Sequence, residues 1–146
     1  MKKLILILTV ILTASLANAQ GKDVKTSEVP DLVTSKFSSL YPGTKAEQWK
    51  SSNGNYETKF SNSGSKMCVV INPSGSVVET STVIKATELP KPAADYVAKN
   101  YAKQKIKESC KTTEAGGKVK YEAVVNDYRL CFDSEGAFVK SEKCKK

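Results

Sequence analysis

One block of the sequence occurs twice in the same order, and this repeat constrains the fold more than any single motif does. Val29-Pro30, Tyr41, Tyr56-Glu57, Gly75 and Val78 correspond to Leu89-Pro90, Tyr101, Tyr121-Glu122, Gly136 and Val139. The offset is 60 residues at the prolines, 65 at the Tyr-Glu pairs and 61 at the glycines. An order that survives small loop insertions is typical of one supersecondary unit used twice. The sequence therefore predicts two tandem copies of the same unit.

Each copy is predicted to begin with an amphipathic helix. Pro30 and Pro90 stand at helix-start positions, where the missing N–H of proline costs nothing. Apolar residues then recur at helical spacing in both copies: Val33, Phe37 and Leu40 in the first, and Ala93, Val97 and Tyr101 in the second. One face of each helix is therefore expected to pack against the rest of its unit.

Four strands are predicted after each helix, because segments of alternating apolar and polar residues are separated by Gly, Asn, Pro and Ser turn signals. The expected strands are residues 45–51, 56–60, 66–72 and 76–84 in the first copy, and 105–111, 118–125, 129–133 and 137–142 in the second. This pattern predicts an α+β fold of two tandem repeats, each a helix plus a four-stranded antiparallel sheet. The helices would cover one face of the sheet and leave the other at least partly open.

The first 19 residues have the features of an export signal. Lys2 and Lys3 precede an apolar run from Leu4 to Leu16, and Ala17-Asn18-Ala19 offers a cleavage site after Ala19. A membrane-anchoring helix is the alternative, but the run is shorter than the roughly 20 residues of a bilayer span. The expected organisation is a signal peptide (1–19), a flexible N-terminal segment (20–28), repeat 1 (29–84) and repeat 2 (85–146). A periplasmic or secreted protein without a membrane span after signal removal is predicted.

Four cysteines remain in the exported chain, and an even count there predicts one or two disulfides. Three pairings are open to Cys68, Cys110, Cys131 and Cys144; we expect Cys110–Cys131 within the second repeat, which leaves Cys68 and Cys144. A zinc site is the alternative for these residues, but the sequence has no histidine and no C-x-x-C pair. A redox-active pair is disfavoured because no two cysteines lie close in sequence near a helix start.

The chain is basic, with a formal net charge of +8. The lysines are spread along the sequence, with a small cluster of Lys140, Lys143, Lys145 and Lys146 at the end. Nucleic-acid binding is one interpretation of such a charge, but exported proteins rarely meet nucleic acid and lysine-rich surfaces commonly maintain solubility. We therefore expect no nucleic-acid partner. Weak attraction to anionic envelope polymers fits the charge equally well.

No enzymatic activity is predicted. Histidine, the commonest general base and metal ligand, is missing from the sequence, and no nucleophile-elbow, phosphate-loop or zinc-protease motif occurs. Glu57 and Glu122 occupy equivalent places in the two repeats and would be the candidate acid–base pair, but polar strand residues near lysines explain them better. Asp133-x-Glu135-Gly136 is too short of oxygen ligands for a calcium loop and is interpreted as a hairpin turn. No catalytic residue, metal or cofactor is expected.

Alternation along the strands indicates which side chains occupy the open face. If Tyr56, Thr58 and Phe60 face the helix, Glu57 and Lys59 face the other way. The candidate protein-binding residues are Trp49, Glu57, Lys59, Lys120, Glu122 and Arg129. Trp49 is the single tryptophan and would suit an anchor at an interface. The alternative for Trp49 is burial against the helix.

Several of these residues resemble the motifs of PepSY-like domains of secreted bacterial proteins. The resemblance rests on Val29-Pro30, Tyr41-Pro42-Gly43, Trp49, Tyr56-Glu57 and Asn72-Pro73-Ser74-Gly75, and it extends from about Val29 to Glu142. The second repeat lacks the Pro-Gly after Tyr101 and has no tryptophan. The resemblance implies a β-lactamase-inhibitor-protein-like fold, in which the two sheets join into one curved platform. The shared residues are turn and core residues, so the resemblance transfers no catalytic or binding site.

The sequence therefore favours a non-enzymatic exported binding module that acts through its open sheet face. Its partner would be a protein of the envelope or outside the cell, and inhibition of such an enzyme is one form of this role. The alternative is a structural or accessory envelope protein that binds anionic polymers by charge. A thiol-redox enzyme is the third hypothesis.

Overall fold

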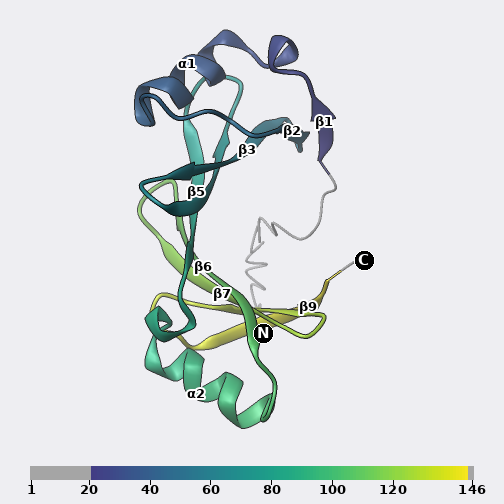
Figure 1. The fold of residues 1–146 in the computed structure, drawn as a ribbon, viewed down its shortest axis with the longest axis vertical. Coiled ribbons are helices and arrows are strands. Elements are labelled where there is room, and N and C mark those ends of the chain that lie inside the picture. Colours follow the sequence, from purple (N-terminus) through teal and green to yellow (C-terminus); the bar gives the residue numbers. More distant parts are fainter. Residues whose placement is uncertain (1–20, 145–146) are drawn as a thin grey trace, which may run out of the picture.

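The computed structural model describes residues 21–144, which form two α-helices and one nine-stranded antiparallel sheet (Figure 1). In chain order the elements are β1 (Lys22–Val24), η1 (Thr26–Glu28), α1 (Asp31–Leu40), β2 (Trp49–Ser52), β3 (Asn55–Asn62), β4 (Ser65–Ile71), β5 (Val77–Ile84), η2 (Ala86–Glu88), α2 (Lys91–Asn100), β6 (Ile106–Glu114), β7 (Val119–Val125), β8 (Tyr128–Phe132) and β9 (Phe138–Lys143). Each strand pairs with the next one in sequence. A helix followed by four strands occurs twice, which confirms the predicted α+β fold.

The predicted signal peptide, residues 1–19, lies outside the described residues. Within residues 21–144, no helix combines the length and the apolar character needed to cross a membrane. The N-terminal segment that was expected to be flexible, residues 20–28, contains β1 and η1 in its described part. β1 pairs with β2, and Val24 packs against the first core. This short segment is thereby held at the sheet edge.

The repeat extends further upstream than the sequence motifs predict. The Glu28 carboxylate accepts a hydrogen bond from the Lys25 N–H at 2.8 Å, and Glu88 accepts the same bond from Lys85 at 2.7 Å. Each short 3-10 helix leads into a proline that precedes the α-helix, Pro30 before α1 and Pro90 before α2. The two units therefore share the whole entry into their helices.

Each helix covers its own half of the same sheet face and encloses a separate core. In the first half, Val33 and Phe37 of α1 pack against apolar strand residues: Trp49, Phe60, Val69 and Ile71. In the second half, Ala93 and Val97 of α2 pack against Ala123, Val125, Leu130 and Phe132. The equivalent helix positions fill both cores, as the helical spacing predicts.

β5 joins the two halves into one curved sheet. It pairs with β4 of the first unit and with β6 of the second. Its Val77 packs on the first core and its Ile84 on the second. Figure 1 shows α1 and α2 on the outer side of the bend, at opposite ends of the molecule. The other face of the sheet lies on the inside of this bend, away from both helices.

Gly136 cannot accommodate a side chain, both because its backbone is left-handed and because α2 packs closely against it. Its φ is +87°, and an added Cβ would lie 2.7 Å from Pro90 Cβ and 3.1 Å from the Ala93 nitrogen. Gly136→Ala is expected to lower the free energy of unfolding by about 2–4 kcal/mol, from left-handed strain plus overpacking against α2. Gly116 has a φ of +91° with nothing within 4 Å of its added Cβ, so Gly116→Ala should cost about 1–2 kcal/mol. Urea unfolding of both variants checks this; equal losses would contradict the close packing of the turn on α2.

Candidate functional site

The inner face of the sheet contains a hollow of about 450 Å³. Successive side chains of a strand point to opposite faces, so the strands that build the two cores also build this hollow. Its lining comes mainly from β3 to β8: Glu47, Glu57, Lys59, Phe60, Lys66, Met67, Cys68, Val70, Glu79, Ser81, Val83, Glu108, Cys110, Thr112, Glu122, Val124 and Arg129. A volume of this size lies within the range of small-ligand and peptide-side-chain pockets.

The structure brings five of the six predicted binding residues onto this face. Glu57, Lys59, Glu122 and Arg129 line the hollow directly. Lys120 lies on the same face of β7, with its ammonium 3.1 Å from the Glu79 carboxylate. Their role in binding stays a prediction, whereas their common location follows from the strand register.

Trp49 does not belong to this face, and its placement among the binding residues is wrong. The side chain is only 3% exposed and lies in the first core, with its ring centroid 5.7 Å from that of Phe37. Trp49 pairs with Thr58, which shares the helix-covered face with Phe60. The alternative interpretation, burial against the helix, is therefore the right one. Trp49 stabilises the first unit instead of contacting a partner.

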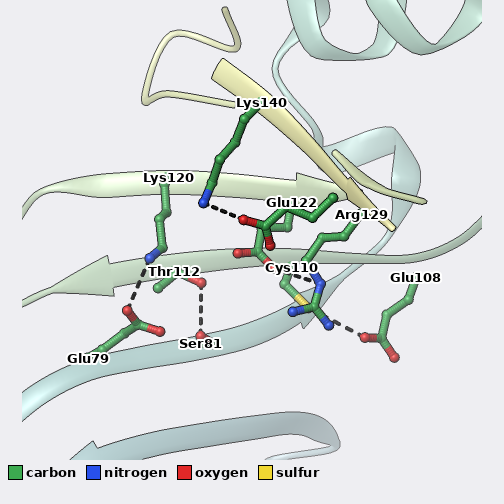
Figure 2. Close-up of polar contacts among 10 residues, drawn as sticks. Glu79, Ser81, Glu108, Cys110, Thr112, Lys120, Glu122, Arg129 and Lys140 are labelled. Atoms are coloured by element: carbon green, nitrogen blue, oxygen red, sulfur yellow. Dashed lines mark hydrogen bonds and ion pairs between the residues drawn. The ribbon is translucent and has the colours of Figure 1, made fainter. Parts of the chain in front are cut away.

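Polar contacts connect β5, β6 and β7 across the junction of the two repeats, and Figure 2 shows two of them, the Lys120–Glu79 ion pair and the Ser81–Thr112 hydrogen bond. The Lys120 ammonium lies 3.1 Å from Glu79 and 3.2 Å from Glu114, and the Ser81 and Thr112 hydroxyls are 2.8 Å apart. Burial raises the pKa of Glu79 above its usual value, although Lys120 opposes this shift. Burial alone would lower the pKa of Lys120, but the charges and hydrogen bonds of Glu79 and Glu114 outweigh it and raise that pKa.

The second half of the face carries two further ion pairs. Arg129, the single arginine of the sequence, lies 3.6 Å from Glu122, and Lys140 lies 2.6 Å from Glu142. Glu57 and Lys59, in the first half, are not part of these pairs. Sequence reasoning missed several lining residues: Glu79, Ser81, Val83, Glu108 and Thr112. The signal for the β5 residues was the alternation of Glu79, Ser81 and Val83, which apolar residues on both faces of that strand obscured.

The predicted disulfides do not form: all four cysteines are free thiols. Cys110 pairs in register with Glu122, and Glu122 pairs with Cys131, so β7 lies between the two cysteines. Two strand spacings are about 9.5 Å, beyond the roughly 7 Å between Cα atoms that a disulfide spans. Cys68 lies on β4 and Cys144 directly after β9, at the far edge of the sheet. The Cys110–Cys131 prediction is therefore wrong for this fold, and Cys68 and Cys144 lie too far apart in the sheet to pair with each other.

Three of these thiols face the inner side and are held in the protonated form. Burial is the largest cause in each case, and neighbouring carboxylates add to it. The pKa of Cys110 rises to about 12, with Glu108 and Glu122 contributing, and that of Cys131 to about 11, with Glu122 contributing. The pKa of Cys68 is raised further, by burial and by Glu57. Because the thiolate is the nucleophile, this environment disfavours the thiol-redox hypothesis.

Alkylation rates test this description of the thiols. At pH 8, iodoacetamide should modify Cys110 and Cys131 about 100-fold or more slowly than the same thiols in the urea-unfolded protein, because a raised pKa depletes the thiolate. The rate should increase about tenfold per pH unit until the pH reaches the raised pKa. Peptide mapping by mass spectrometry gives the rate at each cysteine. Equal rates in the folded and unfolded protein would contradict the protonated thiols.

The acidic residues that would form a catalytic pair lie far apart in the sheet, and the Asp133 carboxylate serves a turn. Glu57 on β3 and Glu122 on β7 have three strands between them, roughly 19 Å along the sheet, whereas glycosidase-type carboxylate pairs lie about 5–9.5 Å apart. The Asp133 carboxylate accepts hydrogen bonds from the N–H groups of Glu135 (3.0 Å) and Ala137 (2.9 Å), as a turn residue does. Within residues 21–144, no cluster of three or more His, Cys, Asp or Glu residues is arranged to hold a metal ion.

Comparisons with solved structures show the same fold in three bacterial proteins. A "putative periplasmic" protein from Bacteroides eggerthii has a TM-score of 0.71 and 16% identity, covering 79% of this chain and 88% of that chain. A DUF2874 family protein from Bacteroides ovatus has a TM-score of 0.67 and 21% identity, covering 78% and 86%. A BLIP-like protein from Bacteroides fragilis has a TM-score of 0.63 and 14% identity, covering 80% and 88%.

The sequence itself matches a family model twice, once for each repeat. The model is described as "Putative beta-lactamase-inhibitor-like, PepSY-like", and it matches residues 15–78 and 69–140. This description names a resemblance to an inhibitor and no enzymatic activity. No curated protein matches the chain. Because the two matches together span most of the sequence, the chain belongs to the PepSY-like, β-lactamase-inhibitor-like family.

Proposed function

We propose that the protein is a non-enzymatic, exported binding module, and that it binds a partner protein through the hollow on the inner face of its sheet. The observation that carries this proposal is the hollow itself. Both helices pack on the opposite face, so the inner face presents an apolar floor of Val70, Val83 and Val124 among charged side chains. Apolar groups ringed by polar ones are typical of protein interfaces.

Two further features support an exported binding role. The N-terminal residues have the composition of a cleavable export signal, and a protein of the same fold is described as "putative periplasmic". The protonated thiols and the missing histidine favour binding over catalysis. An inhibitory role toward an envelope or secreted enzyme is the form of binding that the family description favours.

A pair of steric variants tests the use of the inner face. Val83 lies half-buried on β5 at the hollow, and a tryptophan there would fill the hollow without entering either core. Leu32 on α1 is 61% exposed on the helix side, so Leu32→Trp is the matched control. We expect Val83→Trp to reduce capture of envelope proteins on the immobilised protein about tenfold or more, and Leu32→Trp to leave it unchanged.

Washing at low and then high salt separates this role from charge-driven polymer binding. A shape-matched protein interface persists at high ionic strength, whereas attraction of anionic polymers to the lysine-rich surface is screened. One protein retained by the unmodified chain and lost with Val83→Trp supports the proposal. The accessory envelope role would instead be established by diffuse acidic material that high salt releases and that both variants capture in the same amount as the unmodified chain.

A further inference from the structure

The hollow differs in charge from the rest of the chain. The sequence contains 23 basic and 15 acidic residues, yet five carboxylates line the hollow against three cations. The carboxylates are Glu47, Glu57, Glu79, Glu108 and Glu122, and the cations are Lys59, Lys66 and Arg129. Glu79 is also paired to Lys120 beside the hollow. An acidic pocket in a basic protein is a local feature that composition does not explain.

Each of the three thiols on the inner face has a negatively charged carboxylate close to it. After burial, the next cause that raises the pKa of each thiol is a carboxylate: Glu57 for Cys68, Glu108 for Cys110 and Glu122 for Cys131. Cations oppose these shifts and do not reverse them. These thiols lie on β4, β6 and β8, so each of these strands has a carboxylate close to its inward-facing thiol.

We propose that the hollow receives an extended, basic segment of the partner protein, with lysine or arginine side chains directed at Glu57 on one wall and at Glu108 and Glu122 on the other. The stems of such side chains would cover the valine floor, since lysine and arginine pack their methylene groups on apolar surface. This inference rests on the proposed function and specifies the chemistry of its partner.

The strand positions set a minimum length for that segment. Glu57 lies on β3 and Glu108 on β6, three strand spacings or about 14 Å apart across the sheet. An extended chain rises about 3.3 Å per residue, so at least five residues are needed to reach from one wall to the other. Residues at i and i+4 of an extended chain share one face and lie about 13 Å apart, so two basic residues separated by three others fit both walls.

Three synthetic peptides test the sign of the charge that is recognised. Each is a capped eight-residue peptide of alternating valine and serine, with lysine, glutamine or glutamate at both the second and the sixth positions, which share one face of an extended chain. Because the whole protein carries a charge of +8, long-range attraction alone would favour the glutamate peptide. We expect isothermal titration calorimetry at about 50 mM salt to rank the lysine peptide first and the glutamate peptide last, with at least about tenfold between them.

Charge-removing variants locate the contact. Glu57→Gln and Glu108→Gln should each weaken binding of the lysine peptide about fivefold or more, because each removes one carboxylate partner of a basic side chain. Glu135→Gln removes the same charge from an exposed turn outside the hollow and should leave the affinity unchanged. Thermal unfolding of each variant establishes that it is folded before titration.

Several results would overturn this inference. They are a preference for the glutamate peptide, equal affinity for all three peptides, no binding of any, or a lysine-peptide affinity unaffected by Glu57→Gln and Glu108→Gln. The steric test separates such a result from failure of the proposed function. If Val83→Trp abolishes partner capture while the lysine peptide does not bind, the inner face is a docking surface for a partner of different chemistry. If Val83→Trp has no effect, the proposed function itself fails.

Discussion

Phe132→Ala is expected to lower the free energy of unfolding by about 3–5 kcal/mol. The side chain is 1% exposed at the centre of the second core, with ring centroids 5.8 Å from Tyr96 and 6.1 Å from Phe138. The buried residues that α2 contributes to this core are the small Ala93 and Val97, and Tyr96 of the same helix is only partly buried, so little neighbouring volume is available to fill the cavity. Urea unfolding followed by circular dichroism measures the loss. Phe132→Leu, at about 1–2 kcal/mol, gives the same test if the alanine variant is too unstable.

Phe138 is the matched control for this substitution. Its ring stacks on Tyr96 at 4.3 Å, but the residue is 39% exposed at the outer strand β9. Phe138→Ala therefore removes an aromatic pair and leaves no sealed cavity, and about 1 kcal/mol is expected. A loss as large as that of Phe132→Ala would contradict the assignment of Phe132 as the centre of the second core.

Trp49 makes the same experiment a test of coupling between the two cores. Its fluorescence reports on the first core, whereas Phe132→Ala acts on the second. Because β5 belongs to both units, we expect the fluorescence midpoint to shift as far as the dichroism midpoint, as in a two-state transition. A fluorescence transition that stays in place while the dichroism signal changes would mean that the units unfold independently.

The repeat and the turn signals were sufficient to predict the fold, because they act locally. Asn53-Gly54, Asn72-Pro73-Ser74-Gly75 and Asp133-Ser134-Glu135-Gly136 all adopt turns, and the helices start after Pro30 and Pro90 as expected. β1 was missed because Lys-Asp-Val has no apolar alternation and resembles a linker. Its order comes from pairing with β2, a contact that only the tertiary structure supplies.

The candidate site could be predicted only in part, because alternation places side chains only in long strands and does not show which strands are neighbours. Alternation assigned Glu57 and Lys59 to the open face, because β3 is long and its apolar residues mark one side. β2 has four residues, too few for alternation to place Trp49. The disulfide prediction was wrong because sequence separation does not reveal that β7 lies between Cys110 and Cys131. Strand neighbours, which decide such distances, are a property of the assembled sheet.

Lys120→Met is expected to lower the free energy of unfolding at pH 7 by about 2–4 kcal/mol, because it leaves the Glu79 carboxylate without its partner in a nearly buried place. The Glu79 side chain is 8% exposed, and that of Lys120 is 19% exposed. Lys118→Met, two residues earlier on an exposed position, removes the same charge and should change stability by less than about 0.5 kcal/mol. The double variant Glu79→Gln/Lys120→Met should recover most of the loss, since no charge is then buried alone.

The pH dependence of Lys120→Met identifies Glu79 as the source of the loss. The pKa of Glu79 is already raised in the folded protein, and without Lys120 the attraction that opposes this rise is gone. A carboxyl group whose folded pKa exceeds its unfolded value holds a proton more tightly when folded, so stability falls as pH rises from about 4.5 through the folded pKa. The deficit of Lys120→Met should therefore be largest at pH 7 and shrink toward pH 4.5. A deficit that is constant over this range, or that persists in the double variant, would show that Lys120 stabilises the sheet by packing and not by its charge.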